Sequence, residues 1–380
     1  MATAAALVGV VLILLVLWEG FEVVVLPRRV TRRFRLTKFF FRSFWYSWRA
    51  MVAVLVPKKS RETWLSFFGP LSNLFMIAVW VGVLVFSFAL LLWAEGSPVQ
   101  TAKGTATFLT DLYLSGTTFF TLGLGDVVPL TGLARLLTVV EAGMGFGFLA
   151  LVISYLPALN SSLARREVSI SLLDARAGTP PSATEMLRRH KGEYGMEALR
   201  KLLGVWELWS AELLESHLSY PVLAYFRSQH DNESWLGALT AIMDTCALLM
   251  ITVEGVCTRQ AELTFAIARH TVVDLALVFG RAPQKPAYDR LPPATLEKVE
   301  AVLTEAGLKM HKGEDVEQRL AELRETYEPY VTGLAAFFRM NLPPWVTDRQ
   351  RRDNWQVSAW DPRGAKFRKA RGEEGDTEHF

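Results

Sequence analysis

The stretch TLGLGD at positions 121–126 combines a threonine, two glycines and an acid at regular positions. Glycine reaches left-handed backbone angles without the penalty that a Cβ imposes, and here glycines occupy alternate positions. When alternate residues have left-handed backbone angles, consecutive carbonyl oxygens point to the same side. There they can replace the hydration shell of a cation. Thr121 can add a hydroxyl oxygen, so the stretch predicts a path that conducts ions.

The segments around this stretch are apolar enough to hold it inside a membrane. Residues 71–93 carry no charge and residues 136–159 carry only Glu141, and each is long enough to cross a hydrocarbon core about 30 Å thick. Residues 105–129 are too polar and too short to cross and return. They are expected to form a re-entrant loop that begins with a short helix at about 107–119. Non-helical backbone at membrane depth requires burial in protein or a water-filled path.

This order of span, short helix, TTFFTLGLGD and span resembles the pore domain of potassium channels over about residues 70–158. The resemblance implies K+ coordination by Thr121, Leu122, Gly123, Leu124 and Gly125. It also implies that Asp126 helps to fix the outer mouth and that the inner helix bends at Gly145, with Gly143 and Gly147 as neighbours that could share the bend. Because each chain has one filter, a ring of four filters requires a homotetramer with closed cyclic symmetry.

Two filter positions depart from the usual TVGYG pattern of that family. Leu122 replaces the valine and Leu124 replaces the tyrosine, so the phenol that normally braces the filter is missing. A weakly selective cation channel is therefore an alternative to a potassium-selective one. Thr117 stands where some members place an acid, so no carboxyl pair with Asp126 can form there. A non-conducting, membrane-anchored helical scaffold or sensor is the alternative from another class, and the intact T-x-G-x-G-D argues against it.

Residues 5–26 form a third candidate span, with Glu19 and Glu22 near one end. The neutral start and the missing small-residue cleavage site favour a retained anchor over a signal peptide. The connection that follows has the single acid Glu62 among many basic residues, so it is expected to be cytoplasmic. The N terminus would then lie outside and the C-terminal domain in the cytoplasm of a multi-pass protein in the cell membrane.

The basic run Arg28–Lys38 allows two interpretations. Basic residues recur there at every third position, which is the pattern of a voltage sensor, but Arg28 and Arg33 interrupt the stripe and only one span precedes it. Contact with anionic lipid is therefore favoured. Residues 39–57 are expected to form a helix in the inner interface with three aromatic side chains at headgroup level, Trp45, Tyr46 and Trp48.

The second half of the chain holds most of the acids and predicts a soluble helical domain. Expected helices cover residues 182–203, 205–218, 233–256, 258–279, 294–307 and 314–338. Ser182 and Glu185 are spaced as a capping box at the start of the first helix. The run 236–256 is nearly long enough to span a membrane, but Asp244 lies in its middle, which favours a buried helix of a soluble bundle.

Composition agrees with a hybrid of membrane and soluble parts. The chain has 380 residues, 51% of them hydrophobic, and a net charge of +3. The expected fold is an all-α membrane protein with five parts: anchor 1–27, basic segment 28–69, pore domain 70–160, helical domain 161–345 and polar, disordered tail 346–380. The two cysteines and six histidines have no metal-ligand spacing, although His270 and Asp274 could form a proton-sensitive spot. No enzyme motif, no cofactor beyond K+ and no nucleic-acid partner is expected.

Overall fold

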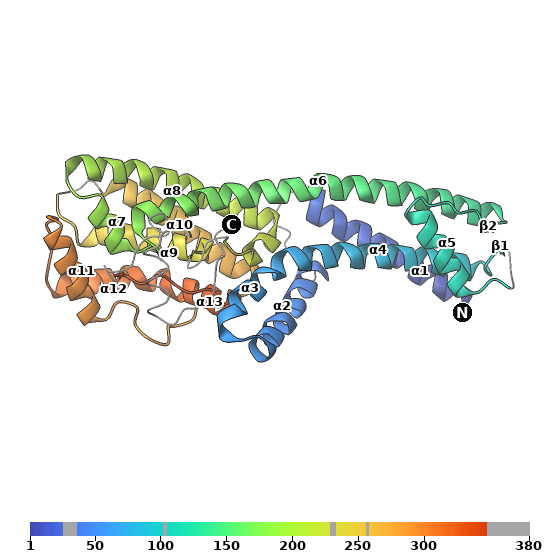
Figure 1. The fold of residues 1–380 in the computed structure, drawn as a ribbon, viewed down its shortest axis with the longest axis horizontal. Helices are drawn as coiled ribbons and strands as arrows, with labels where there is room; N and C mark the ends of the chain where they lie inside the picture. The colour runs from blue at the N-terminus through green and yellow to red at the C-terminus, as the bar shows by residue number, and fades with distance from the viewer. Residues whose placement is uncertain (26–35, 102–104, 229–232, 256–257, 348–380) are drawn as a thin grey trace, which may run out of the picture. The chain divides into compact units, whose positions relative to one another are not determined.

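A computed structural model describes residues 1–25, 36–101, 105–228, 233–255 and 258–347 (Figure 1). The basic positions 28–35 and the tail beyond residue 347 lie outside the described residues, and so do Cys257, His230 and His379. The chain divides into two units. The first comprises Met1–Leu163 and Ser219–Phe226, and the second comprises Ala164–Leu218 and the chain from Arg227 onward.

Three helices of the described chain are long and apolar enough to cross a membrane. These are α1 (Ala2–Gly20), which continues into the π-helical turn η1 (Phe21–Val25), α4 (Phe68–Ala94) and α6 (Gly132–Ala177). They coincide with the three predicted spans. Helix α6 continues well past the predicted end at residue 159, and Pro157 lies inside it. The molecule is therefore built from helices, with membrane-length ones in its first half, as expected for an all-α membrane protein.

The first span packs along α4, and its two acids have hydrogen-bond partners. A Cβ added at Gly9 would lie 2.9 Å from the Ser87 carbonyl oxygen, so the glycine permits a close approach of the two helices. At the other end of α1, the buried Glu19 accepts hydrogen bonds from the Thr37 amide at 3.2 Å and from the Thr37 hydroxyl. Glu22 accepts one from the Trp18 indole at 2.7 Å. These contacts explain how carboxylates are tolerated at the end of an apolar helix.

Helix α2 (Leu36–Leu55) is followed by two short helices, the 3-10 helix η2 (Lys58–Ser60) and α3 (Arg61–Ser66). Helix α2 is not among the helices of the described chain that are long and apolar enough to span a membrane, and its place in the inner interface stays a prediction. The expectation for Trp45 was wrong, because its side chain is only 1% exposed. Its ring packs edge-on against Phe68, with centroids 4.8 Å apart, and against Tyr225 at 5.5 Å. Packing against these aromatic rings removes the indole from the surface that would face headgroups.

The partner ring Tyr225 belongs to η3 (Pro221–Tyr225), a short helical turn far along the sequence. Residues 219–226 pack with the first unit, although the sequence analysis assigned them to the helical domain 161–345. A Cβ at Gly69, in the first turn of α4, would lie 2.7 Å from the Phe226 ring. The first unit thus includes an insertion from the second half of the chain.

A segment with two short strands and one short helix connects α4 to α6. It contains β1 (Val99–Thr101), α5 (Phe108–Phe119) and β2 (Val127–Pro129). The two strands pair antiparallel with Gln100 opposite Val128. A small apolar core made by Leu92, Val99, Leu114 and Ala134 holds the strands and α5 against the two spans. Helix α5 matches the short helix predicted at 107–119.

The second unit is a helical bundle. It contains the end of α6 and seven further helices: α7 (Ala183–Arg189), α8 (Glu193–Ser219), α9 (Trp235–Ile251), α10 (Arg259–Val278), α11 (Pro293–Glu305), α12 (Glu314–Glu325) and α13 (Glu328–Phe338). Helix α9 is central, and every side chain from Trp235 to Leu249 is buried. This 17-residue helix is buried among the other helices, as its central acid indicated.

Two predicted helices are each split in the structure. The first ends at Arg189, and a new helix begins after Gly192, which has a left-handed φ of +78°. Ser182 does accept from the Glu185 amide at 3.3 Å, but the Glu185 carboxylate pairs with Arg188 and Arg189 and does not complete a capping box. The second divides before Pro329, which lacks an amide proton and favours the first turn of a helix.

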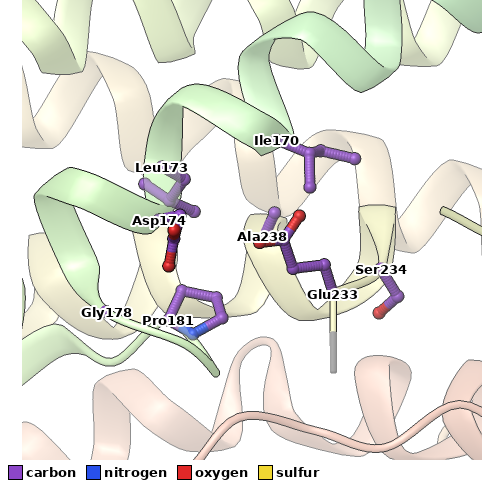
Figure 2. A pocket seen from close by; sticks show the side chains of 8 residues that line it. All are labelled: Ile170, Leu173, Asp174, Gly178, Pro181, Glu233, Ser234 and Ala238. Atoms are coloured by element: carbon purple, nitrogen blue, oxygen red, sulfur yellow. The ribbon is translucent and has the colours of Figure 1, made fainter. Parts of the chain in front are cut away.

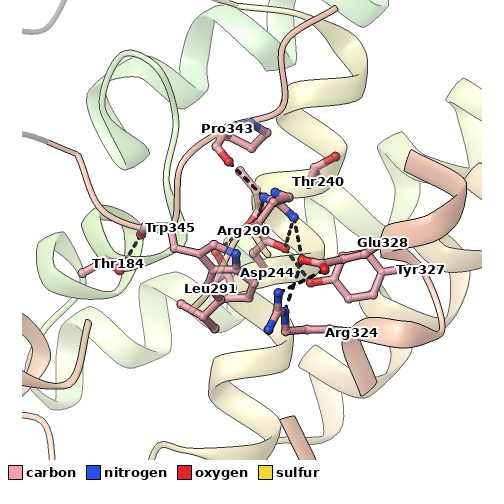
Figure 3. A network of polar contacts seen from close by, with 12 residues as sticks. Thr184, Thr240, Asp244, Arg290, Leu291, Arg324, Tyr327, Glu328, Pro343 and Trp345 are labelled. Carbon is pink, nitrogen blue, oxygen red and sulfur yellow. Dashed lines mark hydrogen bonds and ion pairs between the residues drawn. The ribbon is translucent and has the colours of Figure 1, made fainter. Parts of the chain in front are cut away.

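The acid in the middle of α9 anchors a buried polar network (Figure 3). The Asp244 carboxylate, which is 0% exposed, accepts from the Arg290 guanidinium at 2.6 Å and from the Tyr327 hydroxyl at 2.5 Å. Arg290 also pairs with Glu328 at 3.0 Å. The Trp345 ring lies 5.7 Å from the Arg290 guanidinium carbon, as expected for a cation–π contact. The network ties α9 to α13 and to the segment around Trp345.

Candidate functional site

The stretch 121–126 follows directly after α5 and has the alternating backbone that its glycines predicted. Thr121, Gly123 and Gly125 have φ angles of +56°, +55° and +76°. Leu122 and Leu124 lie between them with no positive φ. Thr121 is not a glycine, so its left-handed conformation costs roughly 1–2 kcal/mol. The local structure must therefore compensate for that cost.

Hydrogen bonds to the last turn of α5 hold the start of this stretch. The Thr121 amide donates to the Thr118 carbonyl at 2.9 Å, and the Leu122 amide donates to the Thr117 carbonyl at 2.7 Å. The side chains of Leu122 and Leu124 remain 60% and 62% exposed in the single chain. The stretch is thus fixed at its inner end by the short helix, while its leucines are not covered by the same chain.

Both ends of α5 fit its role as a short helix that carries the stretch. At its start, Thr107 and Thr110 form reciprocal capping hydrogen bonds. Asp111 lies fully buried in the first turn and accepts from the Ser97 hydroxyl at 2.5 Å. An acid there is stabilised by the positive end of the helix dipole, whereas the negative end at Phe119 lies two residues before Thr121. The negative end favours a cation near the inner end of the stretch.

The outer end is braced by a residue that the sequence analysis did not identify. The Tyr113 hydroxyl donates to the Asp126 carboxylate at 2.9 Å. Within the filter, the sequence indicates only that Leu124 replaces a phenol. The structure supplies a different phenol from α5 to the acid that follows the filter. The sequence signal that could have identified this contact is Tyr113 itself, an aromatic residue with a hydroxyl group on the predicted short helix.

The segment that follows Asp126 is fixed to the end of α4. Strand β2 pairs with β1, and the Leu130 amide donates to the Pro98 carbonyl at 2.9 Å. The Thr131 hydroxyl donates to the Glu95 carboxylate at 2.6 Å and also accepts from the Ala134 amide at the start of α6. The chain therefore leaves the stretch along a defined path into the third span.

The predicted hinge glycines lie in an unbroken part of α6. A Cβ at Gly145 would lie 2.0 Å from the Phe119 carbonyl oxygen, which no side chain could tolerate without movement. In the part of the chain that the structure describes, no atom of another element lies within 4 Å of a Cβ added at Gly143 or Gly147. Gly145 thus permits the close approach of α6 to the end of α5, and its role as a hinge remains a prediction.

A second candidate region is a narrow hollow in the second unit (Figure 2). It is lined by Ile170, Leu173, Asp174, Gly178, Pro181, Glu233, Ser234 and Ala238. Burial, with added repulsion from Asp174 and Glu167, raises the pKa of Glu233 to about 7. No group of three or more His, Cys, Asp or Glu side chains in the described chain is placed to hold a metal ion. His270 lies 3.4 Å from Asp274 but is 59% exposed, as in an ordinary surface pair.

Comparisons with known proteins support the first of these regions. The family described as "Ion channel" matches residues 74–160, which contain α5, the stretch 121–126 and the spans on either side. The chain is 25% identical over 182 residues to the uncharacterized membrane protein YdjJ of Bacillus subtilis (strain 168), covering 47% of this chain and 52% of that protein. It is 33% identical over 94 residues to Protein LctB of Geobacillus stearothermophilus, covering 22% of this chain and 69% of that protein.

The chain spans about half the length of the first relative. No solved structure matches it significantly. The matched segment coincides with the span, re-entrant helix, glycine-containing stretch and span described above. By this match and its similarity to LctB, the chain belongs to the family of pore-loop ion channels with two spans around the loop.

Proposed function

We propose that four copies of this chain form a potassium channel in which residues 121–125 replace the water around K+ and coordinate the ion. The observation that carries the proposal is the alternating left-handed backbone at Thr121, Gly123 and Gly125, directly after a re-entrant helix. Carbonyl oxygens in such a backbone can replace water around a dehydrated cation. The hydroxyl of Thr121 adds an oxygen ligand at the inner end, and Asp126 carries negative charge at the outer end.

The proposed homotetramer rests on the number of filters in each chain. One chain supplies one such stretch, and a closed ring of oxygen ligands requires several copies around one axis. The exposed Leu122 and Leu124 side chains are consistent with contacts that a single chain does not provide. Bending of α6 near Gly145 is the proposed gate, with Gly143 and Gly147 in the same part of the helix.

A weakly selective cation channel is the second candidate, and Leu122 and Leu124 are the observation that favours it. Neither side chain carries a hydrogen-bonding group, so neither can brace the filter as a tyrosine does. The Tyr113–Asp126 hydrogen bond stabilises only the outer end. Selectivity against Na+ then depends on how firmly the middle of the filter is held.

The proposed orientation places the N terminus outside and the helical second unit in the cytoplasm of the cell membrane. It rests on the excess of basic residues between the first two spans. Anionic lipid headgroups are the proposed partners of Arg28–Lys38, most of which lies outside the described residues. No cofactor other than permeating K+ is part of the proposal.

Ion flux into liposomes containing the purified protein tests this function. We expect K+ uptake well above Na+ uptake and block by barium. Equal uptake of the two ions would favour the weakly selective channel. If the intact tetramer carries neither ion, the non-conducting scaffold becomes the better interpretation.

The substitution Gly123→Ala tests the filter assignment directly. A Cβ at a φ of +55° strains the backbone and turns the carbonyl away from its neighbours, so K+ uptake should fall to the level of empty liposomes. The matched control is Gly82→Ala in α4, where nothing lies within 4 Å of the added Cβ. Native mass spectrometry should show tetramers for both variants. Potassium uptake that survives in Gly123→Ala would contradict the assignment.

A further inference from the structure

A buried polar contact joins three helices behind the filter. The Ser115 hydroxyl, on α5, lies 2.7 Å from the Val85 carbonyl oxygen of α4. The same hydroxyl contacts the Glu141 carboxyl group of α6 within hydrogen-bond distance. Ser115 is 0% exposed and Glu141 is 1% exposed. A serine and an acid therefore meet in the interior of the membrane part of the chain.

The number of protons available to these groups determines the state of Glu141. A serine hydroxyl has one proton, and a peptide carbonyl oxygen has none. If Ser115 donates to Val85, the contact with Glu141 is a hydrogen bond only when Glu141 supplies the proton. If Ser115 instead donates to an ionised Glu141, two oxygen atoms without a proton between them remain 2.7 Å apart at Val85. Both contacts are satisfied only when Glu141 is a carboxylic acid.

The surroundings of Glu141 favour the same state. Glu141 is the only charged residue between positions 136 and 159. Among the described residues it forms no ion pair. The groups that face it from α5 and α4 are a neutral hydroxyl and, through that hydroxyl, a neutral carbonyl. An ionised carboxylate without a cation is costly in such a setting, and such groups become neutral instead.

Ser115 is directly connected to the filter through the turn that follows it. The carbonyl groups of Gly116, Thr117 and Thr118 accept hydrogen bonds from the amides of Phe120, Leu122 and Thr121, respectively. Helix α6 contacts α5 again one turn later, where Gly145 meets the Phe119 carbonyl. Contacts at 115 with 141 and at 119 with 145 lie four residues apart on each helix. The two helices are thus held in one register just before the filter begins.

We propose that Glu141 is a neutral carboxylic acid that donates a hydrogen bond to Ser115 and thereby positions α5 and the filter against α6. Its effect on ion selectivity rests on the proposed channel function. Its protonation and its bond to Ser115 do not, and they can be tested separately. Glu141 is a positioning residue, because it acts on the permeating ion only through the short helix.

Infrared spectroscopy of the purified protein in liposomes tests the protonation. The difference between wild type and Glu141→Gln at pH 7.5 should contain the carbonyl stretch of a protonated carboxylic acid, which shifts in D2O. Ser115→Ala should move this band, because the acid loses its acceptor. Thr138→Ala should leave it in place, because among the described residues the Thr138 hydroxyl bonds only to the Ala134 carbonyl of its own helix. If the band is missing from the wild-type difference spectrum, or does not respond to Ser115→Ala, the proposal is overturned.

Ion flux in the same liposomes tests the positioning role. Glutamine keeps a neutral donor, so Glu141→Gln should retain the wild-type ratio of K+ to Na+ uptake. Glu141→Leu leaves Ser115 without this donor, so the ratio should fall about tenfold. An unchanged ratio in Glu141→Leu, or an equal loss in Glu141→Gln, would overturn the role. If wild type carries no ion, the proposed function fails while the infrared result still decides whether Glu141 is tied to Ser115.

Discussion

Tyr113 provides the only side-chain hydrogen bond to Asp126 that the described residues show. Because Leu124 has no hydroxyl group, the outer end of the filter depends on this contact. We expect Tyr113→Phe to reduce the ratio of K+ to Na+ uptake about three- to tenfold while retaining the ring and its packing. A hydrogen bond to a charged acceptor contributes about 1.5–3 kcal/mol, part of which water recovers at an exposed site.

The measurement is paired K+ and Na+ flux in liposomes. The control is Tyr288→Phe, which removes the hydroxyl group of a tyrosine in the second unit. Tyr288 is 75% exposed. An unchanged ratio in Tyr113→Phe would show that Asp126 is held without this bond.

Gly145 combines a close contact with a predicted hinge, and substitution can separate the two. Gly145→Ala places a methyl group 2.0 Å from the Phe119 carbonyl oxygen, so α5 and α6 must separate. We expect loss of K+ uptake and a tetramer that dissociates at lower detergent concentration. If helix bending alone is what matters, Gly143→Ala should be equally harmful, because it also stiffens the helix but meets no atom within 4 Å. Flux and native mass spectrometry on both variants decide between these outcomes.

At the residue scale, backbone requirements were predictable from the sequence and side-chain contacts were not. Two glycines at alternate positions indicated the left-handed angles that the structure has at Gly123 and Gly125. The contacts of Asp126 with Tyr113 and of Glu141 with Ser115 depend on how three helices pack. The sequence contains these residues but no spacing that specifies which of them meet.

At the scale of elements, long apolar segments were predicted well because hydropathy over 20 or more residues leaves few alternatives. The three spans confirm this. Shorter polar helices were predicted less well. A regular apolar pattern continues across Pro329, so the pattern alone did not reveal the break there. At Gly192 the signal was present but missed, because the polar run Arg188–Glu193 interrupts the apolar pattern. The burial of Trp45 was missed because its partner, Tyr225, is 180 residues away in the sequence.

The start of α9 carries a group that should make stability depend on pH. Glu233 precedes the N-cap Ser234, and burial raises its pKa to about 7 in the folded state. A carboxyl whose folded pKa is raised stabilises the fold fully below its unfolded value of about 4.5, and this contribution is lost as pH rises through about 7. We expect the free energy of unfolding to fall by on the order of 1 kcal/mol between pH 4.5 and 8, after allowance for solvent screening.

Thermal unfolding of wild type and Glu233→Gln across this range checks the expectation. The variant should lose that part of the pH dependence, because its amide does not titrate. An identical pH dependence in the two proteins would show that Glu233 has an ordinary pKa.

At the scale of the whole molecule, the ion network around α9 is expected to dominate the stability of the second unit. Arg290 is 5% exposed and pairs with both Asp244 and Glu328. Arg290→Leu leaves two buried acids without their shared cation, so the free energy of unfolding should fall by about 3–5 kcal/mol. Denaturant unfolding measures this loss, with Arg259→Leu as the control because its pair with Glu262 is exposed and contributes little. A loss of less than 1 kcal/mol in Arg290→Leu would contradict the network's importance.

The segment 219–226 bears on how freely the two halves of this chain could be exchanged between proteins. The chain leaves the second unit after Leu218 and rejoins it at Arg227, and the residues between them cover Phe68 and Gly69 in the first unit. The C-terminal half is therefore not a transferable module. A chimaera that joined this pore to a foreign regulatory domain at residue 163 would leave the start of α4 without its own aromatic cover. Recombination within the family would have to carry this eight-residue insertion, or a substitute for it, along with the pore.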